Sequence, residues 1–229
     1  MSAWDVIDYG AHAVLLRERP RGPRASASDR AGGPGDLAGL ADRLRRVSAV
    51  REVVPAFGEV LVTWAPGSAR GTVLEKLRRV ISEPAIADVS RRETVVHVLP
   101  VRYDGPDLAA VAAACGITPE RVIGLHTAAT YVVAAVGFQP GFAYLTGLDP
   151  ALRLPRRAAP RRRVSPGAVA IAAAYAAVYP HASPGGWHLI GETAEELFSA
   201  RQPRDGEGHD AGARLRVGDR VRFTPLIRP

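Results

Sequence analysis

The sequence has one cysteine and one lysine, and both shortages narrow the chemistry open to it. A single thiol, Cys115, excludes an internal disulfide and any metal site that needs two thiolates. Cys115 ends an alanine-rich apolar run without a charged neighbour, so the pattern favours a small buried hydrophobe over a catalytic thiol. Any Schiff-base or phosphate-binding lysine would have to be Lys76, yet VLEKLRRVI is typical of a solvated helix face.

Several signatures of enzymes and membrane proteins are absent from the sequence. Neither the phosphate-binding pattern GxxxxGK[ST] nor the hydrolase patterns GxSxG and HExxH occurs, so any ATP site is of another type. No run approaches the ~18 consecutive apolar residues that a membrane span needs. The start, MSAWDVIDYG, lacks the basic and apolar regions of a signal peptide, and we therefore expect a cytoplasmic protein with no membrane partner.

Positive charge, by contrast, is plentiful. Lys and Arg total 30 against 23 Asp and Glu, which gives a net charge of +7. Nearly all of this charge is arginine, which, beside heavy use of Ala, Gly and Pro, is more typical of GC-rich codon usage than of a binding surface. The aromatic residues that interleave with basic ones in single-strand binders make up only 6% of the chain. We therefore do not expect nucleic acid as a partner.

Residues 1–99 alternate between strand and helix patterns, which predicts a small α+β domain. Leu37, Leu40 and Leu44 follow Asp36 at helical spacing, and Asp36 suits a helix N-cap. The segment 17–36, rich in Pro, Gly, Ser and Arg, predicts a long loop. The remaining elements are a helix at 71–81 and strands at 13–16, 52–55, 60–64 and 94–99. The order βαββαβ is that of a ferredoxin-like sandwich.

Residues 100–127 predict a helical connector. Asp107 begins the run DLAAVAAACG, and Gly116 suits the left-handed residue that ends a helix. A second helix begins at Thr118-Pro119-Glu120, which combines a cap residue, a proline in the first turn and an acid near the positive end of the helix dipole.

Residues 128–229 carry short β-rich runs separated by Pro and Gly turns, which predicts a small antiparallel barrel or sandwich. Four motifs follow in order: YVVAAVGFQPGFAYLTGL, LPRRAAPRRRVSPGAVAIA, VYPHASPGGWHLIGET and VGDRVRFTPL. This series resembles the family of the 5-oxoprolinase B subunit, allophanate hydrolase subunit 1 and KipI-like proteins, whose members carry GFxPGFxYL, PRxxxPR, YPxxSPGGW and a terminal GDxVxF strand. The resemblance extends upstream through LPVRYDGPDL to the LHT around His126.

The resemblance implies a cyclophilin-like β-barrel domain at 128–229, behind the α+β domain. It implies one subunit of an ATP-dependent 5-oxoprolinase, a hydrolase complex that opens 5-oxoproline to L-glutamate, with this subunit helping to activate the lactam. ATP, with Mg²⁺, would be shared with partners: a second cyclophilin-like barrel of the C-subunit type and a third subunit of a different fold, of the A-subunit type. With few candidate acids or bases and no stand-alone ATP motif, the chain alone would be inactive.

Two alternatives remain within the same family. One is a non-catalytic KipI-like inhibitor of a histidine kinase, or a degenerate paralogue. The other is an allophanate hydrolase- or urea carboxylase-associated subunit.

The motif GFQPGFAYL predicts part of a binding site. Gly137 and Gly141 bracket Pro140 and permit a sharp turn whose N–H groups can hold a carboxylate or phosphate oxygen. A tight barrel corner with its aromatic residues in the core explains the pattern equally well. The walls of the site would be aromatic: Tyr131, Phe138, Phe142 and Tyr144.

The arginine-rich motif predicts an anion-binding segment. Pro155 and Pro160 hold their neighbours extended, so the guanidinium groups project at set intervals and suit bidentate capture of a carboxylate or phosphate. We predict catalytic roles for Arg156 and Arg161, which match PRxxxPR. For Arg162 and Arg163 we favour a solvated basic loop.

The motif SPGGW predicts a turn that enters a strand. Gly185 and Gly186 permit close approach of a ligand, and Trp187 offers a flat wall for a ring. His126 and His188 are candidates for proton transfer at neutral pH. An isolated histidine in a β-protein is more often structural, and only the family match favours His126 as a catalytic residue.

One strand departs from the family pattern. Members continue as GSVAIAGxQTGIYP, whereas this chain has GAVAIAAAYAAVYP. Ala168 replaces a hydroxyl residue and Ala173 a glycine, while Gln, Thr and Gly are replaced by Tyr175, Ala176 and Ala177. A site lined by this strand would lose polar contacts. The change leaves the fold prediction intact and favours the non-catalytic alternative.

Overall fold

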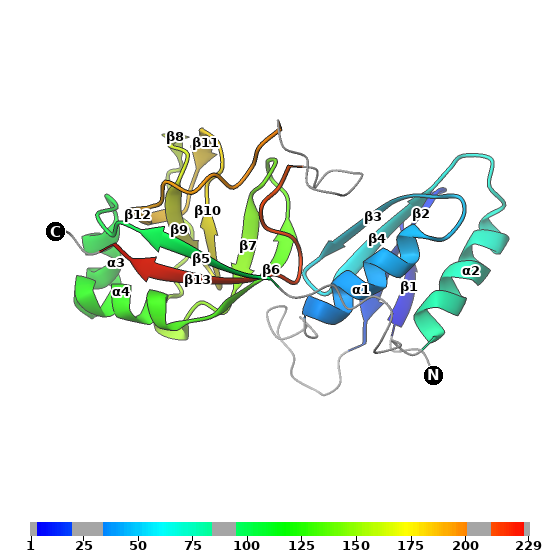
Figure 1. Ribbon diagram of the computed structural model, residues 1–229, viewed down its shortest axis with the longest axis horizontal. Helices are drawn as coiled ribbons and strands as arrows, with labels where there is room; N and C mark the ends of the chain where they lie inside the picture. The colour runs from blue at the N-terminus through cyan, green and yellow to red at the C-terminus, as the bar shows by residue number, and fades with distance from the viewer. Residues whose placement is uncertain (1–3, 20–33, 84–94, 201–211, 227–229) are drawn as a thin grey trace. The chain divides into compact units, whose positions relative to one another are not determined.

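The computed structural model describes residues 4–19, 34–83, 95–200 and 212–226. The chain divides into two compact units, residues 1–94 and 95–229. Figure 1 labels their helices and strands in chain order.

The first unit is an antiparallel sheet with two helices that contact each other on one of its faces (Figure 1). Its strands are paired in the order β1-β2-β4-β3. Alternation explains β4, in which Val60, Val62 and Trp64 are buried, and helical spacing explains the second helix, which buries Val73, Leu77 and Ile81. The elements are β1 (Trp4–Asp8), β2 (Ala13–Glu18), α1 (Pro34–Arg45), β3 (Val50–Ala56), β4 (Glu59–Trp64) and α2 (Arg70–Ser82).

The ferredoxin-like order is not confirmed. A strand that the pattern did not reveal, β1, precedes β2 and pairs with it, so the unit begins with a hairpin. The strand expected to close the sandwich is β5 (Val96–Val101), which pairs in parallel with β13 (Arg220–Pro225) in the second unit. The alternation of β5 shows that one of its faces is buried, but it does not show which sheet the strand joins. Helix α1 begins at Pro34, before the Asp36 expected as its N-cap, and most of the predicted 17–36 loop lies outside the described residues.

The second unit is built on a sheet with the strand order β5-β13-β6-β7-β10-β9-β12. All neighbours are antiparallel except β5 and β13. A separate two-stranded ribbon consists of β8 and β11. The other elements are α3 (Leu108–Cys115), α4 (Pro119–Ala128), β6 (Tyr131–Val136), β7 (Ala143–Thr146), a 3-10 turn (Pro150–Leu152), β8 (Arg161–Val164), β9 (Ala168–Ala172), β10 (Tyr175–Val178), β11 (Ser183–Gly185) and β12 (His188–Glu192).

The two ends of this sheet meet through the segment that follows β5. Arg102 and Glu192 exchange backbone hydrogen bonds of 2.8 and 2.9 Å, so the end of β5 is joined to the end of β12. The backbones approach so closely that a Cβ on Gly105 would overlap Ile190, and one on Gly191 would lie 2.6 Å from the carbonyl oxygen of Arg102. Glycine at both positions is what permits this connection.

The helix boundaries of the second unit confirm the capping signals. Helix α3 ends at Gly116, which has the left-handed φ of 67°. Thr118 caps α4 by accepting a hydrogen bond from the N–H of Arg121 at 3.2 Å. Cys115 is half-buried at the end of α3. In the described residues no single helix is long and apolar enough to cross a membrane, and only the α3–α4 pair, bent by 91°, meets those criteria jointly.

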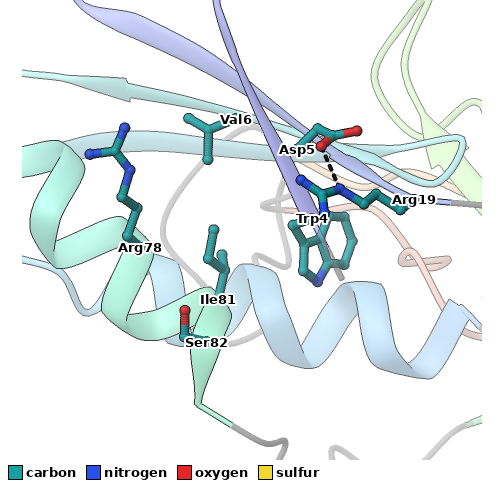
Figure 2. Close-up of a pocket in the computed structure, with 7 residues that line it drawn as sticks. All are labelled: Trp4, Asp5, Val6, Arg19, Arg78, Ile81 and Ser82. Atoms are coloured by element: carbon teal, nitrogen blue, oxygen red, sulfur yellow. Dashed lines mark hydrogen bonds and ion pairs between the residues drawn. The ribbon is translucent and has the colours of Figure 1, made fainter. Parts of the chain in front are cut away.

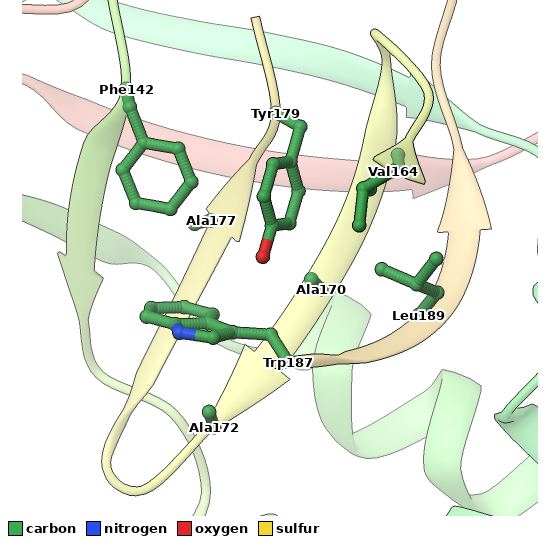
Figure 3. Packing of buried hydrophobic residues seen from close by; sticks show 9 residues of the cluster. Phe142, Val164, Ala170, Ala172, Ala177, Tyr179, Trp187 and Leu189 are labelled. Carbon is green, nitrogen blue, oxygen red and sulfur yellow. The ribbon is translucent and has the colours of Figure 1, made fainter. Parts of the chain in front are cut away.

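Large aromatic side chains pack against alanine-rich strands in the second unit. Figure 3 shows Phe142, Tyr179 and Trp187 over the small side chains of β9 and β10. Every residue of β9 is buried, and Ala176 and Ala177 of β10 have no exposed surface. Alanine at these positions leaves the volume that the three large rings fill.

Ala173 occupies a strained position in the turn between β9 and β10. The turn has two residues, because Ala172 pairs with Tyr175, and Ala173 has a φ of 50°. A two-residue hairpin normally places glycine where φ is positive, and a side chain there costs free energy. The family pattern has glycine at this position, so the substitution carries a local cost.

Replacing Ala173 by glycine should therefore raise the free energy of unfolding. We expect a gain of about 1 kcal/mol, seen as a rise in Tm of about 2–4 °C in a thermal scan. Ala174→Gly is the matched control, since Ala174 has no positive φ and glycine there should only increase the entropy of the unfolded chain. A loss of stability in both variants would contradict the assignment of strain to Ala173.

Candidate functional site

The structure brings together the aromatic residues of two predicted motifs. Phe142 lies at the centre, with ring centroids 5.1–5.7 Å from four neighbours in edge-to-face arrangements. Three of these neighbours were predicted from the sequence: Phe138, Tyr144 and Trp187. The fourth, Tyr179, was not. The segments GFQPGFAYL and SPGGW therefore contribute to one cluster, as a shared site requires.

Burial separates the members of this cluster by role. Phe142 and Trp187 are 2% and 5% exposed, so both are core residues and the barrel-corner interpretation applies to them. Phe138 is 64% exposed and Tyr144 is half-buried. Only the last two leave ring surface for a ligand or a partner.

The turn that carries Phe138 is tight and locally strained. Gly137 donates its N–H to the carbonyl oxygen of Phe142, and Phe142 donates to that of Gln139, both at 3.0 Å. Phe138 has a φ of 74°, which is unusual for an aromatic residue. Strain of this kind is concentrated at functional sites. Pro140 is exposed, while Gly141 is buried against Leu197 and Phe198.

The arginine-rich segment converges on a buried carboxylate that sequence analysis did not select. One oxygen of Asp107 accepts hydrogen bonds from Arg157 Nη1 at 2.9 Å and Arg161 Nη2 at 2.7 Å. Its other oxygen accepts the N–H of Leu189 at 2.8 Å. The side chain of Asp107 is only 5% exposed. It is positioned by the glycine-permitted contact between residues 102–107 and β12.

Opposing effects act on the ionisation of Asp107. Burial alone would raise its pKa, but hydrogen bonds from Arg161 and Leu189 and the charges of Arg161 and Arg157 outweigh burial, so the pKa lies below its ordinary value. Asp107 is therefore an anion at neutral pH. Its role is to hold two guanidinium groups, not to transfer protons.

Tyr179 connects the aromatic cluster with the arginines. Its hydroxyl points toward Trp187 in Figure 3. Burial raises the pKa of Tyr179, while a hydrogen bond with the backbone of Trp187 and the charges of Arg156 and Arg161 act in the opposite direction. A Cβ on Gly185 would overlap the Tyr179 hydroxyl, so this glycine makes room for a protein side chain and not for a ligand.

Of the remaining predicted residues, some are exposed and others form hydrogen bonds that involve the backbone. Arg156, Arg162 and Arg163 are exposed. Gly186 accepts the N–H of Arg157 through its carbonyl oxygen at 2.8 Å, which ties the arginine segment to the SPGGW turn. His188 pairs with the carbonyl oxygen of Pro155 at 2.9 Å.

His126 lies in the core of the second unit. It has no exposed surface, its Nδ1 pairs with the Tyr103 hydroxyl at 2.7 Å, and its ring lies 4.5 Å from that of Phe223. Burial lowers its pKa to about 3, so the ring is neutral at pH 7. Tyr131 is equally buried and donates its hydroxyl to the carbonyl oxygen of His126 at 3.0 Å. These contacts are those of packing residues, and a role in proton transfer or ligand binding stays a prediction.

Sequence reasoning missed Asp107, Arg157 and Tyr179. Asp107 precedes a helix, which is the usual place of an N-cap, but its side chain makes no capping hydrogen bond. Only the three-dimensional structure shows that this aspartate does not cap the helix. Arg157 was passed over because it falls outside the spacing of PRxxxPR.

A pocket of about 600 Å³ lies in the first unit, and none of the predicted site residues lines it (Figure 2). Trp4 and Val6 of β1 and Ile81 of α2 form apolar parts of its wall. Arg19 pairs with Asp5 at 2.6 Å beside them, and Arg78 and Ser82 complete the lining. Among the described residues, no group of three or more His, Cys, Asp or Glu side chains is arranged to hold a metal ion.

Comparison with known proteins identifies the class to which this fold and these motifs belong. Residues 9–205 match the family described as carboxyltransferase domain, subdomain C and D. A protein of Escherichia coli O157:H7, named as the B subunit of 5-oxoprolinase, is 40% identical over 187 residues, which cover 81% of this chain and 83% of that protein. A protein of the same name from Bacillus subtilis is 37% identical over 69% of this chain and 62% of its own length.

The chain is thus a carboxyltransferase-domain protein of the C and D subdomain type. Within that class it belongs to the family of the 5-oxoprolinase B subunit and KipI-like proteins, as its motifs predicted.

Solved structures agree with this assignment. TTHA0988 matches with a TM-score of 0.74 and 34% identity over 95% of this chain, which spans about 40% of the length of that protein. PH0987 from Pyrococcus horikoshii matches with a TM-score of 0.53 and 29% identity over 97% of both chains. The urea amidolyase of K. lactis, at 18% identity and a TM-score of 0.66, shows the fold alone.

Replacing Asp107 by asparagine should lower the free energy of unfolding by about 2 kcal/mol at pH 7, because two guanidinium groups lose a charged acceptor. Since the folded pKa of Asp107 is lowered, its contribution is present above the ordinary value of 3.8 and is lost as the pH falls through the folded value. Urea unfolding between pH 7 and pH 2 should show that the difference in free energy of unfolding between wild type and Asp107→Asn becomes smaller at acid pH.

Asp104→Asn provides the control for this measurement. Asp104 is exposed and pairs with Arg102, so its loss should change the free energy of unfolding by about 0.5 kcal/mol or less. A gap between wild type and Asp107→Asn that stays constant to the lowest pH would show that the carboxylate charge does not stabilise this fold.

The buried, neutral His126 should make stability fall below pH 6.5. The unfolded chain protonates this histidine near 6.5, whereas the folded chain resists protonation until pH 3 or so, so the unfolded state binds more protons between these values. The test compares the variant Tyr103→Phe with the double variant Tyr103→Phe/His126→Phe. Between pH 6 and pH 4.5 the free energy of unfolding of the single variant should fall more steeply than that of the double variant, by about 1.4 kcal/mol per pH unit. Parallel curves for the two variants in chemical unfolding would refute this assignment.

Proposed function

We propose that this chain is the B-type subunit of a 5-oxoprolinase, a hydrolase complex that opens the lactam of 5-oxoproline to L-glutamate at the expense of ATP. The observation that carries the proposal is the 40% identity, over 81% of the chain, to a protein of that name. The relative from Haemophilus influenzae, 38% identical over 66% of the chain, bears the same name. The urea carboxylase and urea amidolyase structures, at 18% identity, support only a common fold.

The chemistry of the reaction agrees with the residues at the candidate site. Amide resonance makes a lactam carbonyl a poor electrophile, and phosphorylation of its oxygen would create a leaving group. Positioned arginines stabilise the negative charge that develops in such a transfer. Arg156, Arg157 and Arg161 supply this charge beside Tyr179. ATP enters as a substrate, and Mg²⁺ would accompany its phosphates.

Partner subunits are part of the proposal. The name of the relatives points to a complex, and TTHA0988 extends well beyond the part that this chain matches. The half-exposed ring surface of Phe138 and Tyr144 suits contact with a second barrel-type protein, because aromatic residues are enriched in interface cores. A third subunit of different fold would manage ring opening.

A specific observation favours a second candidate, a non-catalytic KipI-like or degenerate family member. Ala176 is fully buried and the ring of Tyr175 lies 6.1 Å from that of Tyr144, so these two residues pack where the family pattern has Thr and Gln. A strand repacked in this way loses the threonine hydroxyl and the glutamine amide as contacts to a ligand.

The two candidates predict different results from co-expression. If the chain is a catalytic subunit, the purified chain alone should show no 5-oxoproline-dependent ATP hydrolysis, and activity should appear with the C-type and A-type subunits. Release of phosphate and of glutamate measures this directly. Turnover by the single chain would contradict the need for partners.

An assembled but inactive complex would favour the non-catalytic candidate. In that event the variant Ala173→Gly/Tyr175→Gln/Ala176→Thr/Ala177→Gly, which restores the family pattern, tests whether β10 is the cause. Failure of the chain to bind either partner would reject its assignment to the complex.

A further inference from the structure

Two arginines of the second unit each keep a buried hydrogen-bond donor without a partner. Within the part of the chain that the structure describes, Arg157 Nε and Arg161 Nη1 make no hydrogen bond, although another nitrogen of each guanidinium binds Asp107. The hydroxyl of Ser183 is a third such atom. The described residues contain five buried side-chain polar atoms without partners, and three of them thus come from one short stretch of structure.

The strand pairing places the residues that carry these three atoms on one ribbon and on the segment bound to it. In the β8–β11 ribbon, Ser183 lies opposite Val164 and Gly185 lies opposite Arg161. The carbonyl oxygen of Gly186 binds the N–H of Arg157, which holds the preceding segment against the same ribbon. Val164 is part of the aromatic core cluster, so the ribbon borders Tyr179 and Trp187.

Unpaired buried donors are costly, because each has lost its hydrogen bonds to water without replacement. Native proteins keep only a few such atoms, and several of them on one short ribbon point to a binding partner for these groups. The local charge indicates the sign of that partner. Arg157 and Arg161 share the single carboxylate of Asp107, and the charge of Arg156 also acts on the neighbouring Tyr179, which leaves an excess of positive charge.

Asp107 determines how the guanidinium groups are presented. A single oxygen of its carboxylate binds both arginines, and the backbone of Leu189 holds the other oxygen. Each guanidinium has donors on more than one edge, so a group held on one edge by Asp107 keeps the remaining donors for a second anion. The arrangement is therefore set before any ligand arrives.

We propose that Arg157, Arg161 and Ser183 form a subsite for an anionic oxygen group, a carboxylate or a phosphoryl group of a small substrate, with Asp107 as the positioning residue. This inference rests on the proposed function, which supplies both groups: the carboxylate of 5-oxoproline and the phosphates of ATP. Phe138 and Tyr144 offer ring surface in the neighbouring aromatic cluster. The subsite thus deepens the site predicted from PRxxxPR by replacing Arg156 with Arg157.

Steady-state kinetics of the full complex test the subsite. Arg157→Lys and Arg161→Lys keep a positive charge near Asp107 but remove the unpaired donor. Each should raise KM for one substrate about tenfold or more, with a smaller change in kcat. Arg163→Lys, an exposed neighbour in β8, is the matched control. A rise in KM for 5-oxoproline identifies the carboxylate as the bound group, and a rise in KM for ATP identifies a phosphoryl group.

Ser183→Ala separates binding from folding. Because the Ser183 hydroxyl has no partner among the described residues, its removal should not lower Tm. It should nevertheless raise the same KM that Arg157→Lys and Arg161→Lys raise, by about threefold to tenfold for one hydrogen bond. If all three variants match Arg163→Lys in both KM values while the complex stays assembled, the subsite does not exist.

Direct binding keeps the inference separate from the proposed function. If the wild-type complex shows no turnover, the proposed function fails, and calorimetry of the full chain with L-5-oxoproline, inorganic phosphate and uncharged 2-pyrrolidinone decides the subsite. The subsite is supported if the wild-type chain binds either anion but not 2-pyrrolidinone, and if this binding is lost in Arg161→Lys and kept in Arg163→Lys. Absence of anion binding to the wild-type chain overturns it.

Discussion

The carboxylate of Asp107 links parts of the second unit that are far apart in sequence. It binds the backbone of Leu189 in β12 and the side chains of Arg157 and Arg161, so the connection after β5, the ribbon strand β8 and the closing strand β12 meet at one group. A buried ion pair stabilises a fold only when its geometry and hydrogen bonds are nearly complete. Asp107 satisfies that condition because both of its oxygens accept hydrogen bonds. Arg157 and Arg161 do not satisfy it, because each keeps a buried donor without a partner among the described residues.

This asymmetry distinguishes a structural ion pair from a prepared binding site. A network that served stability alone would be expected to satisfy all of its members, since a half-satisfied network is less favourable than apolar packing. Here the anion is fully bound and the cations retain free donors. The same region holds an exposed aromatic residue, Phe138, in a strained backbone conformation. Unmet donors and strain occur together on the segments that join the sheet strands, where folds commonly place function.

Much of this organisation could be predicted from the sequence, and the failures have physical causes. The glycine and proline motifs predicted the turns in GFQPGFAYL and SPGGW, because turn residues act locally, and the family resemblance predicted that both motifs contribute to a site. The caps of α3 and α4 were predicted for the same reason. The partner of β5 could not be, because alternation identifies a buried face but not the sheet that covers it. Asp107 was not selected because an aspartate before a helix has two possible roles, and only its distances to Arg157 and Arg161 show which one applies.

His126, His188 and Asp107 are each engaged in contacts within the second unit. His126 is neutral and fully enclosed, with its pKa lowered by burial, and His188 is bound to a backbone carbonyl. Asp107 is held as an anion by two arginines and is not free to accept a proton at neutral pH. The residues gathered here therefore bind and polarise, which are tasks for arginine and aromatic side chains. The proposed opening of a lactam also requires a group that moves protons, and under that proposal we expect a partner subunit to supply it.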